Sequence, residues 1–138
     1  MNILKVLTAA RRTGDIGELA AEKMLRKKGY KILERNYVGD GNEIDIIAKN
    51  REFTVFVEVK TRTASERLTQ RAAAAVTPEK QRRIIHAASV YAAFHPSDRK
   101  LRFDVVEVLC EAQGDARRVV SLEHIEGAFN KNTAYSPR

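Results

Sequence analysis

The sequence contains a single cysteine, Cys110, among its 138 residues. One cysteine excludes an internal disulfide framework and a zinc site built from cysteines. No apolar stretch approaches the roughly 18 to 20 residues that a membrane span requires, and no secretory core follows the basic start of the chain. We therefore expect a soluble cytoplasmic protein without a membrane partner, in which Cys110 is a small buried residue in a reducing compartment.

The chain also lacks a glycine-rich phosphate-binding loop and a nucleophilic serine signature. Its histidines, at positions 86, 95 and 124, show no mutual spacing typical of metal ligands, so we expect structural roles for them. The composition itself is globular, with 43% hydrophobic and 31% charged residues. Its 25 basic and 18 acidic residues give a net charge of +7. This excess favours an acidic partner such as nucleic acid, with a merely well-solvated surface as the alternative.

Hydrophobic periodicity predicts an α/β fold with the element order α-β-β-β-α-β-β. The pattern is clearest in two adjacent strands, at 43–49 and 52–61, where apolar and polar residues alternate. The expected elements are a helix at 13–28, strands at 30–37, 43–49 and 52–61, a helix at 78–94, and strands at 101–110 and 117–122.

These elements predict one domain over residues 13–129, a length that can bury a sizeable core. Residues 1–12 are interpreted as an N-terminal extension, and residues 130–138 as a polar, flexible tail. The segment 61–77 is left unassigned, although its alanine run at 72–75 is compatible with a helix.

The two alternating strands bring acidic side chains together. Glu58 and Lys60 are two residues apart in a strand and therefore share a face. The preceding strand contributes Glu43 and Asp45 to the same face of the predicted hairpin. A two-residue loop would place Glu43 opposite Glu58, whereas a four-residue loop would place Asp45 there.

Such crowding has an energetic cost that a cation can remove. Two carboxylates about 5 Å apart repel each other by roughly 3 kcal/mol at an effective dielectric of about 20. Magnesium prefers hard oxygen ligands, and Lys60 beside it would orient or activate a water molecule. The alternative is a solvated sheet face with cross-strand ion pairs to Lys49 and Arg62. A second acid-x-lysine triplet, at 98–100, has no acidic strand beside it and is interpreted as a decoy.

Several blocks of the sequence resemble the YraN-type family of uncharacterised conserved bacterial proteins. They are GDIGE at 14–18, RNY at 35–37, NEIDIIA at 42–48, VFVEVKTR at 55–62, FDVV at 103–106 and HIEGAF at 124–129. The likeness covers about residues 13–129. This family is similar to the restriction-endonuclease-like PD-(D/E)XK nucleases, most of all to archaeal Holliday junction resolvases, which implies a mixed sheet flanked by helices.

The resemblance also implies roles for individual residues. Asp45 and Glu58 would hold magnesium or manganese, with the Val59 carbonyl as a further ligand. Lys60 would position the attacking water, and Glu18 on the first helix would complete the catalytic acidic site. Because the family's own reaction is undefined, the chemistry follows from fold analogy alone.

Three positions carry alternatives. Glu18 recurs with Glu22 and Arg26 every four residues, which is also typical of a solvated, salt-bridged helix face. Glu43 is either a base that acts next to the metal ligands or simply a charged residue at the start of a strand. Asn42 stands where the family usually has glycine, which changes a turn and not a ligand.

A basic segment follows the acidic face in the sequence. Between positions 60 and 83, seven residues are basic and two are acidic. Nucleic-acid phosphates are the expected partners of this segment, and a solvated face is the alternative. The expected phosphate-binding residues are Arg62, Arg67, Arg71, Lys80, Arg82 and Arg83.

We therefore predict a magnesium- or manganese-dependent endonuclease that hydrolyses phosphodiester bonds in DNA, with branched DNA as a candidate substrate. Two alternatives remain open. One is a non-catalytic nucleic-acid-binding module on the same fold, and the other is a protein-interaction domain whose charge serves only solubility. Cutting of a junction would favour a twofold homodimer, because two strands must be cut symmetrically.

Overall fold

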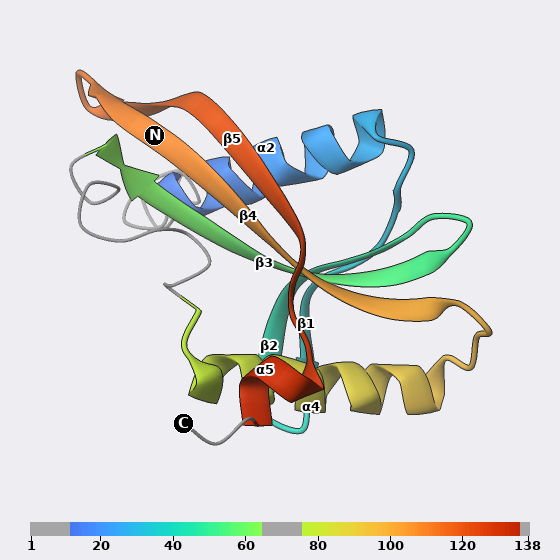
Figure 1. The fold of residues 1–138 in the computed structure, drawn as a ribbon. Helices are drawn as coiled ribbons and strands as arrows, with labels where there is room; N and C mark the ends of the chain where they lie inside the picture. The colour runs from blue at the N-terminus through green and yellow to red at the C-terminus, as the bar shows by residue number, and fades with distance from the viewer. Residues whose placement is uncertain (1–11, 65–75, 136–138) are drawn as a thin grey trace.

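The computed structural model describes residues 12–64 and 76–135 (Figure 1). The elements are α2 (Arg12–Lys27), β1 (Lys31–Gly39), β2 (Asn42–Lys49), β3 (Phe53–Thr63), α4 (Pro78–Phe94), β4 (Lys100–Gln113), β5 (Ala116–Phe129) and α5 (Lys131–Tyr135). This confirms the predicted order and adds a short C-terminal helix. Residues 1–11 of the predicted extension and the alanine run at 72–75 lie outside the described residues.

The strands form one five-stranded sheet in the order β1-β2-β3-β4-β5. Strands β3 and β4 are parallel, because α4 carries the chain back between them, and the other neighbouring pairs are antiparallel. The sheet is therefore mixed, as the family resemblance implied.

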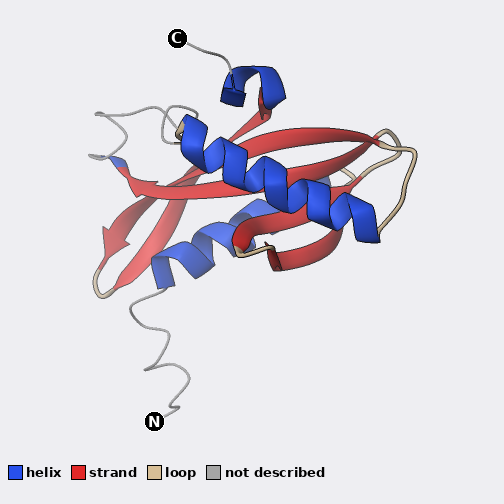
Figure 2. Cartoon of the chain, turned by 90° about the horizontal axis from the view of Figure 1, so that it is seen from below, coloured by secondary structure: helices blue, strands red, loops and turns tan. Residues whose placement is uncertain are grey.

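Helices cover both faces of the twisted sheet, with α2 on one side and α4 and α5 on the other (Figure 1, Figure 2). Under α2, Leu25 packs in a core cluster with Val57 of β3. Under α4, Ile84 packs in a second cluster with Phe56 of the same strand. The alternative of a solvated face on β3 does not hold, because Glu58 on the α4 side is only 4% exposed.

Two local features fix how the helices approach β3. Gly17 of α2 lies against Thr61, and a Cβ at position 17 would overlap the Thr61 hydroxyl. The Thr77 side chain caps α4 by accepting a hydrogen bond from the backbone N–H of Lys80 at 3.2 Å, and Pro78 opens the helix. As a result, Glu18 of α2 and Lys80 of α4 are held at the two faces of the same strand.

Of the predicted flexible tail over 130–138, residues 130–135 form a capped helix, and residues 136–138 lie outside the described residues. The Asn130 side chain accepts a hydrogen bond from the Thr133 N–H at 3.1 Å, and the Thr133 hydroxyl accepts one from the Asn130 N–H at 2.9 Å. This reciprocal cap starts α5, whose Ala134 is buried. Strand β5 also continues past the predicted end at position 122, because an exposed edge strand needs no alternating pattern.

Two predictions about the whole chain can be compared with the structure. Cys110 is a free and buried cysteine, as predicted, and it belongs to the core cluster under α2. Within the described ranges, none of the helices has both the length and the apolar character needed to cross a membrane.

Candidate active site

The β2–β3 hairpin has the four-residue connection, which decides between the two predicted registers. Lys49 pairs with Thr54, and the Asn50 side chain accepts hydrogen bonds from the N–H groups of Glu52 and Phe53 at 3.0 and 2.8 Å. This Asx-type turn fixes the loop length. Continued toward the site, the register brings Asp45, and not Glu43, to the level of Glu58.

Asp45 lies where β2 separates from β3. The regular pairing of the two strands reaches Ile46 and Val57, and beyond it Asp45 Oδ2 accepts a hydrogen bond from the Val59 N–H at 2.8 Å. Its neighbours Ile44 and Ile46 belong to different core clusters, so the strand passes from one layer to the other at this residue. Asp45 is thereby accessible to side chains from both layers.

The carboxyl group of Asp45 is electrostatically strained. Burial is the main reason that its pKa rises from 3.8 to about 7, and the charge of Glu58 adds to the rise. Glu18 raises it further, whereas the Val59 N–H and the charge of Lys80 oppose the shift. A strongly perturbed carboxyl beside a second buried carboxylate is typical of functional sites.

Two lysines face the second carboxylate. Lys80 Nζ lies 2.7 Å from Glu58 Oε1, and Lys60 Nζ lies 3.8 Å from the same oxygen. Burial and the neighbouring charge of Lys80 lower the pKa of Lys60. Burial also opposes the charge of Lys80, but its hydrogen bond to Glu58 and the charges of Glu58 and Asp45 together outweigh this effect and raise the pKa of Lys80. Lys60 is therefore the more readily deprotonated of the two amines.

Glu18 approaches the same carboxyl from α2. It lines a cavity of about 250 Å³ together with Asp45. The salt-bridged helix face predicted as an alternative is real, but its carboxylate is Glu22, which pairs with Arg26 at 2.9 Å and with Arg35 at 2.5 Å. The hydrogen bond from Arg35 lowers the pKa of Glu22 to about 2 despite partial burial.

Glu43 lies outside this group of carboxylates. It is exposed and pairs with Val38 of β1. It lines a cavity of about 460 Å³ together with Lys80 and Arg83, next to the Gly41 turn. A supporting role for Glu43 stays a prediction. In the structure, Glu43 lines the same cavity as Lys80 and does not line the cavity that contains Asp45.

The predicted basic segment is divided among different environments. Arg62 is a correction, because it is 6% exposed and its guanidinium lies 3.3 Å from the buried Glu107, so it is not presented to an external phosphate. Arg82 donates to the Ala134 carbonyl at 2.7 Å and so holds α5. Arg83 is exposed and pairs with Glu79. Two further candidates, Arg67 and Arg71, lie outside the described residues.

The donor set fits magnesium as a partly hydrated ion. In the parts of the chain that the structure describes, no group of three or more histidine, cysteine, aspartate or glutamate side chains could hold a metal ion. Magnesium commonly takes one or two carboxylates and completes its shell with water and substrate phosphate. Asp45 and Glu58 supply such a pair, and Glu18 lies close enough to affect the Asp45 pKa.

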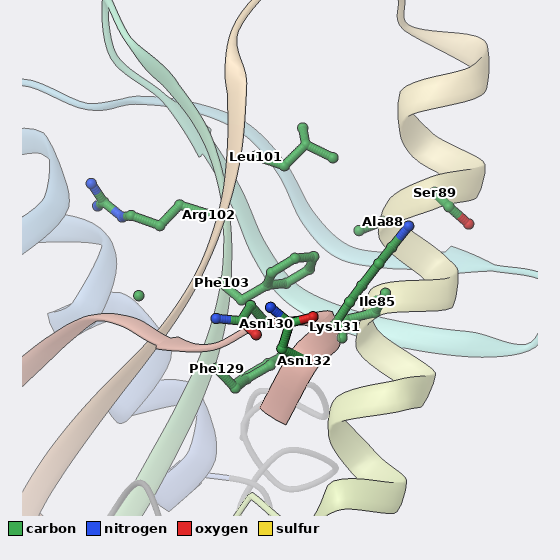
Figure 3. A pocket seen from close by; sticks show the side chains of 11 residues that line it. Ile85, Ala88, Ser89, Leu101, Arg102, Phe103, Phe129, Asn130, Lys131 and Asn132 are labelled. Carbon is green, nitrogen blue, oxygen red and sulfur yellow. The ribbon is translucent and has the colours of Figure 1, made fainter. Parts of the chain in front are cut away.

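A separate cavity of about 460 Å³ lies between α4, β4 and the C-terminal end (Figure 3). Its walls are largely apolar, with the side chains of Phe103 and Phe129 directed toward α4 and Lys131 extending past Ile85 (Figure 3). It shares no lining residue with the group formed by Asp45, Glu58, Lys60 and Lys80, so we do not place the chemistry there.

Lys80 has a contact that sequence reasoning misses. The sequence predicts a phosphate contact for it, which stays a prediction, and the structure shows a contact with Glu58, which lies 22 positions earlier in the sequence. A signal was available in part, because Thr77 and Pro78 mark the start of α4 and put Lys80 in its first turn. The direction of that turn toward β3 is a tertiary feature that no local pattern encodes.

A mixed sheet flanked by helices, with a carboxylate–lysine group where two strands separate, defines an α/β protein with one candidate acidic site. Comparison with known proteins gives the family. The chain belongs to the uncharacterised protein family UPF0102, the YraN-type family, whose model matches residues 17–108. The family resemblance noted in the sequence is thereby confirmed.

Similar proteins share most of their length with this chain. A UPF0102 protein of Chlorobium phaeobacteroides (strain BS1) is 45% identical over 118 residues, which is 84% of this chain and 92% of that protein. One of Pelobacter propionicus is 43% identical over 122 residues, or 86% and 83% of the two chains. One of Moorella thermoacetica is 42% identical over 120 residues, or 86% and 96%. The family is uncharacterised, so membership in it assigns no activity to this chain.

Proposed function

We propose that this protein is a magnesium- or manganese-dependent nuclease that hydrolyses phosphodiester bonds in DNA. The observation that carries the proposal is the meeting of Asp45 and Glu58, which burial and mutual repulsion strain and which two lysines partly neutralise. A fold gains nothing from such a pair, because like charges in a poorly hydrated place destabilise it. A divalent cation would remove the strain.

In this proposal, Asp45, Glu58 and the Val59 carbonyl hold the metal, and Glu18 supports them from α2. When bound, such a metal would supply Lewis-acid polarisation of the phosphate and would make water more acidic. Lys60, on the same strand face as Glu58, holds the attacking water at its amine. Arg83, next to Lys80 in the neighbouring cavity, binds backbone phosphate, so DNA affinity should fall steeply with salt.

The test is a cleavage screen of the purified protein. Single-stranded, duplex, flapped and four-way DNA are incubated with magnesium or manganese, and we expect cleavage of at least one form. Lys60→Ala should slow cleavage about 10²- to 10⁴-fold, the range for loss of a proton-handling group, while DNA affinity stays nearly constant. The matched control is Lys100→Ala, which removes the lysine of the decoy triplet and an exposed pair with Glu52.

Equal loss of binding and cleavage in Lys60→Ala would indicate a folding defect, and unchanged cleavage would contradict the proposed role.

A second candidate function is a non-catalytic nucleic-acid-binding module. The observation that favours it is Lys80, which already neutralises Glu58 without a metal. That candidate predicts salt-dependent DNA binding, no cleavage and no response to Lys60→Ala. If four-way DNA is the preferred substrate, we expect a twofold homodimer. Analytical sedimentation of the protein would test this oligomeric state.

A further inference from the structure

Glu58 already has a cationic partner from another element. Lys80 Nζ lies 2.7 Å from Glu58 Oε1, which is the length of a charge-assisted hydrogen bond. Lys60 Nζ is 3.8 Å from the same oxygen, too far for such a bond. The carboxylate that the proposed function assigns to the metal is therefore held by the first turn of α4.

We propose that Lys80 is a tethered cation that competes with the divalent metal for the Glu58 carboxylate. The inference rests on the proposed function, because it takes Asp45 and Glu58 as the metal's ligands. An ammonium group and a metal ion on one carboxylate repel each other, so a metal at Glu58 weakens the Lys80 contact, most strongly at Oε1, the oxygen that Lys80 already occupies. Without metal, the same contact keeps a 4% exposed carboxylate paired.

The displaced side chain has a place to go. The Lys80 side chain is 41% exposed, and it lines the cavity of about 460 Å³ that also contains Arg83. Lysine has a flexible four-carbon stem, so its ammonium can move while the capped backbone of α4 stays in place. In that cavity the ammonium would join Arg83 as a second cation for a substrate phosphate.

Two expectations for Lys80 are thereby joined. The sequence predicts that Lys80 contacts phosphate, and the structure shows that it contacts the Glu58 carboxylate. In this proposal, the Lys80 side chain moves between these two positions when the metal binds. By thermodynamic linkage, a metal that releases Lys80 strengthens phosphate binding, and phosphate that retains Lys80 strengthens metal binding. The site would then be completed only when metal and substrate are both present.

The experiment is a calorimetric titration of Mn²⁺ into the wild-type protein, Lys80→Gln, Lys80→Met and Arg83→Gln at one ionic strength, without DNA. Loss of a competing charge-assisted hydrogen bond should tighten Mn²⁺ binding by about tenfold or more in both Lys80 variants. Arg83→Gln is the matched control, because it removes one positive charge from the same helix and cavity while its guanidinium pairs with Glu79. Its affinity should change by less than about twofold.

Each result separates this inference from the function on which it rests. If the Lys80 variants and Arg83→Gln tighten Mn²⁺ binding equally, only the general charge matters and the competition is refuted, while the metal site stands. Unchanged affinity in both Lys80 variants refutes it in the same way. Absence of Mn²⁺ binding in the wild type and in every variant removes the metal site, and the competition with it. Lys80→Met provides a second neutral side chain if Lys80→Gln does not fold.

Discussion

Two carboxylates in this molecule are placed on neighbouring parts of the sheet in opposite surroundings. Asp104 of β4 is fully buried, and Arg102 donates two hydrogen bonds to it, both of 2.8 Å. His124 Nε2 and the Gly127 N–H lie 2.7 and 2.9 Å from its oxygens. Asp45 of β2 instead faces the carboxylates of Glu58 and Glu18, with the Val59 N–H as its hydrogen-bond donor.

The two surroundings move the pKa in opposite directions. Burial opposes ionisation of Asp104, but the hydrogen bonds from His124, Arg102 and Gly127 outweigh it and lower the pKa. Burial raises the pKa of Asp45 to about 7, and Glu58 adds to the rise. Burial raises the pKa of both residues, so the charges and hydrogen-bond donors beside each one decide the direction of the net shift.

The comparison separates a structural role from a functional one. A buried charge whose hydrogen bonds are all supplied by the fold stabilises and orients that fold. A buried charge placed beside like charges is destabilising unless a cation, from the chain or from outside it, lies there. Asp104 belongs to the first kind, and His124 with it, as predicted for the histidines. Asp45 belongs to the second, which is why we place the candidate chemistry at this residue.

The largest expected effect is on Asp104. Asp104→Asn removes the charge that pairs with Arg102, and breaking a buried pair costs about 3 to 5 kcal/mol. Thermal unfolding followed by circular dichroism should show a Tm that is lower by at least about 10 °C. Asp98→Asn changes an exposed aspartate of the decoy triplet and should leave the Tm nearly unchanged. Similar Tm values for both variants would contradict the structural role of Asp104.

The second expected effect is smaller and has the opposite sign. The pKa of Asp45 rises from 3.8 to about 7 on folding, so its neutral form favours the fold. Its contribution is fully present below about pH 4 and is lost as the pH rises through about 7. Asp45→Asn keeps an acceptor for the Val59 N–H and carries no charge. Without metal, it should be more stable than the wild type near pH 8, and the difference should shrink as the pH falls and vanish below about pH 4.

The gain in Asp45→Asn is limited by the lysines. A pKa shift from 3.8 to about 7 corresponds to at most about 4 kcal/mol, but loss of the Asp45 charge leaves Lys60 and Lys80 with less compensation. We expect a gain of about 1 to 2 kcal/mol near pH 8, measured by urea unfolding in a chelating buffer. A variant that is less stable than the wild type across this pH range would show that Asp45 supports the fold as Asp104 does.

Much of this comparison could be predicted from sequence. Alternation in β2 and β3 placed Glu58 and Lys60 on one face, and the family resemblance added Glu18. The sequence leaves open whether Asp45 or Glu43 lies opposite Glu58. The Asn50 side chain, which fixes this register, is nevertheless a recognisable turn signal. Such features are local, and local patterns can be read from the chain.

The remaining features depend on contacts between distant residues. The contacts of Lys80 with Glu58 and of Arg62 with Glu107 join residues on elements that only the folded sheet brings together. A basic residue in a run looks the same in sequence whether it faces solvent or the interior. For this reason the sequence predicts a single basic segment, and the structure divides its described members among several environments.

We propose that Asp45 and Glu58 form a site for a divalent metal. The most direct test of this site is thermal unfolding of the wild type and of Asp45→Asn with increasing Mg²⁺ or Mn²⁺. At a free metal concentration about 100 times the Kd, the wild type should gain about 2.7 kcal/mol, and Asp45→Asn should gain little. Equal stabilisation of both proteins, or none in the wild type, would contradict the claim.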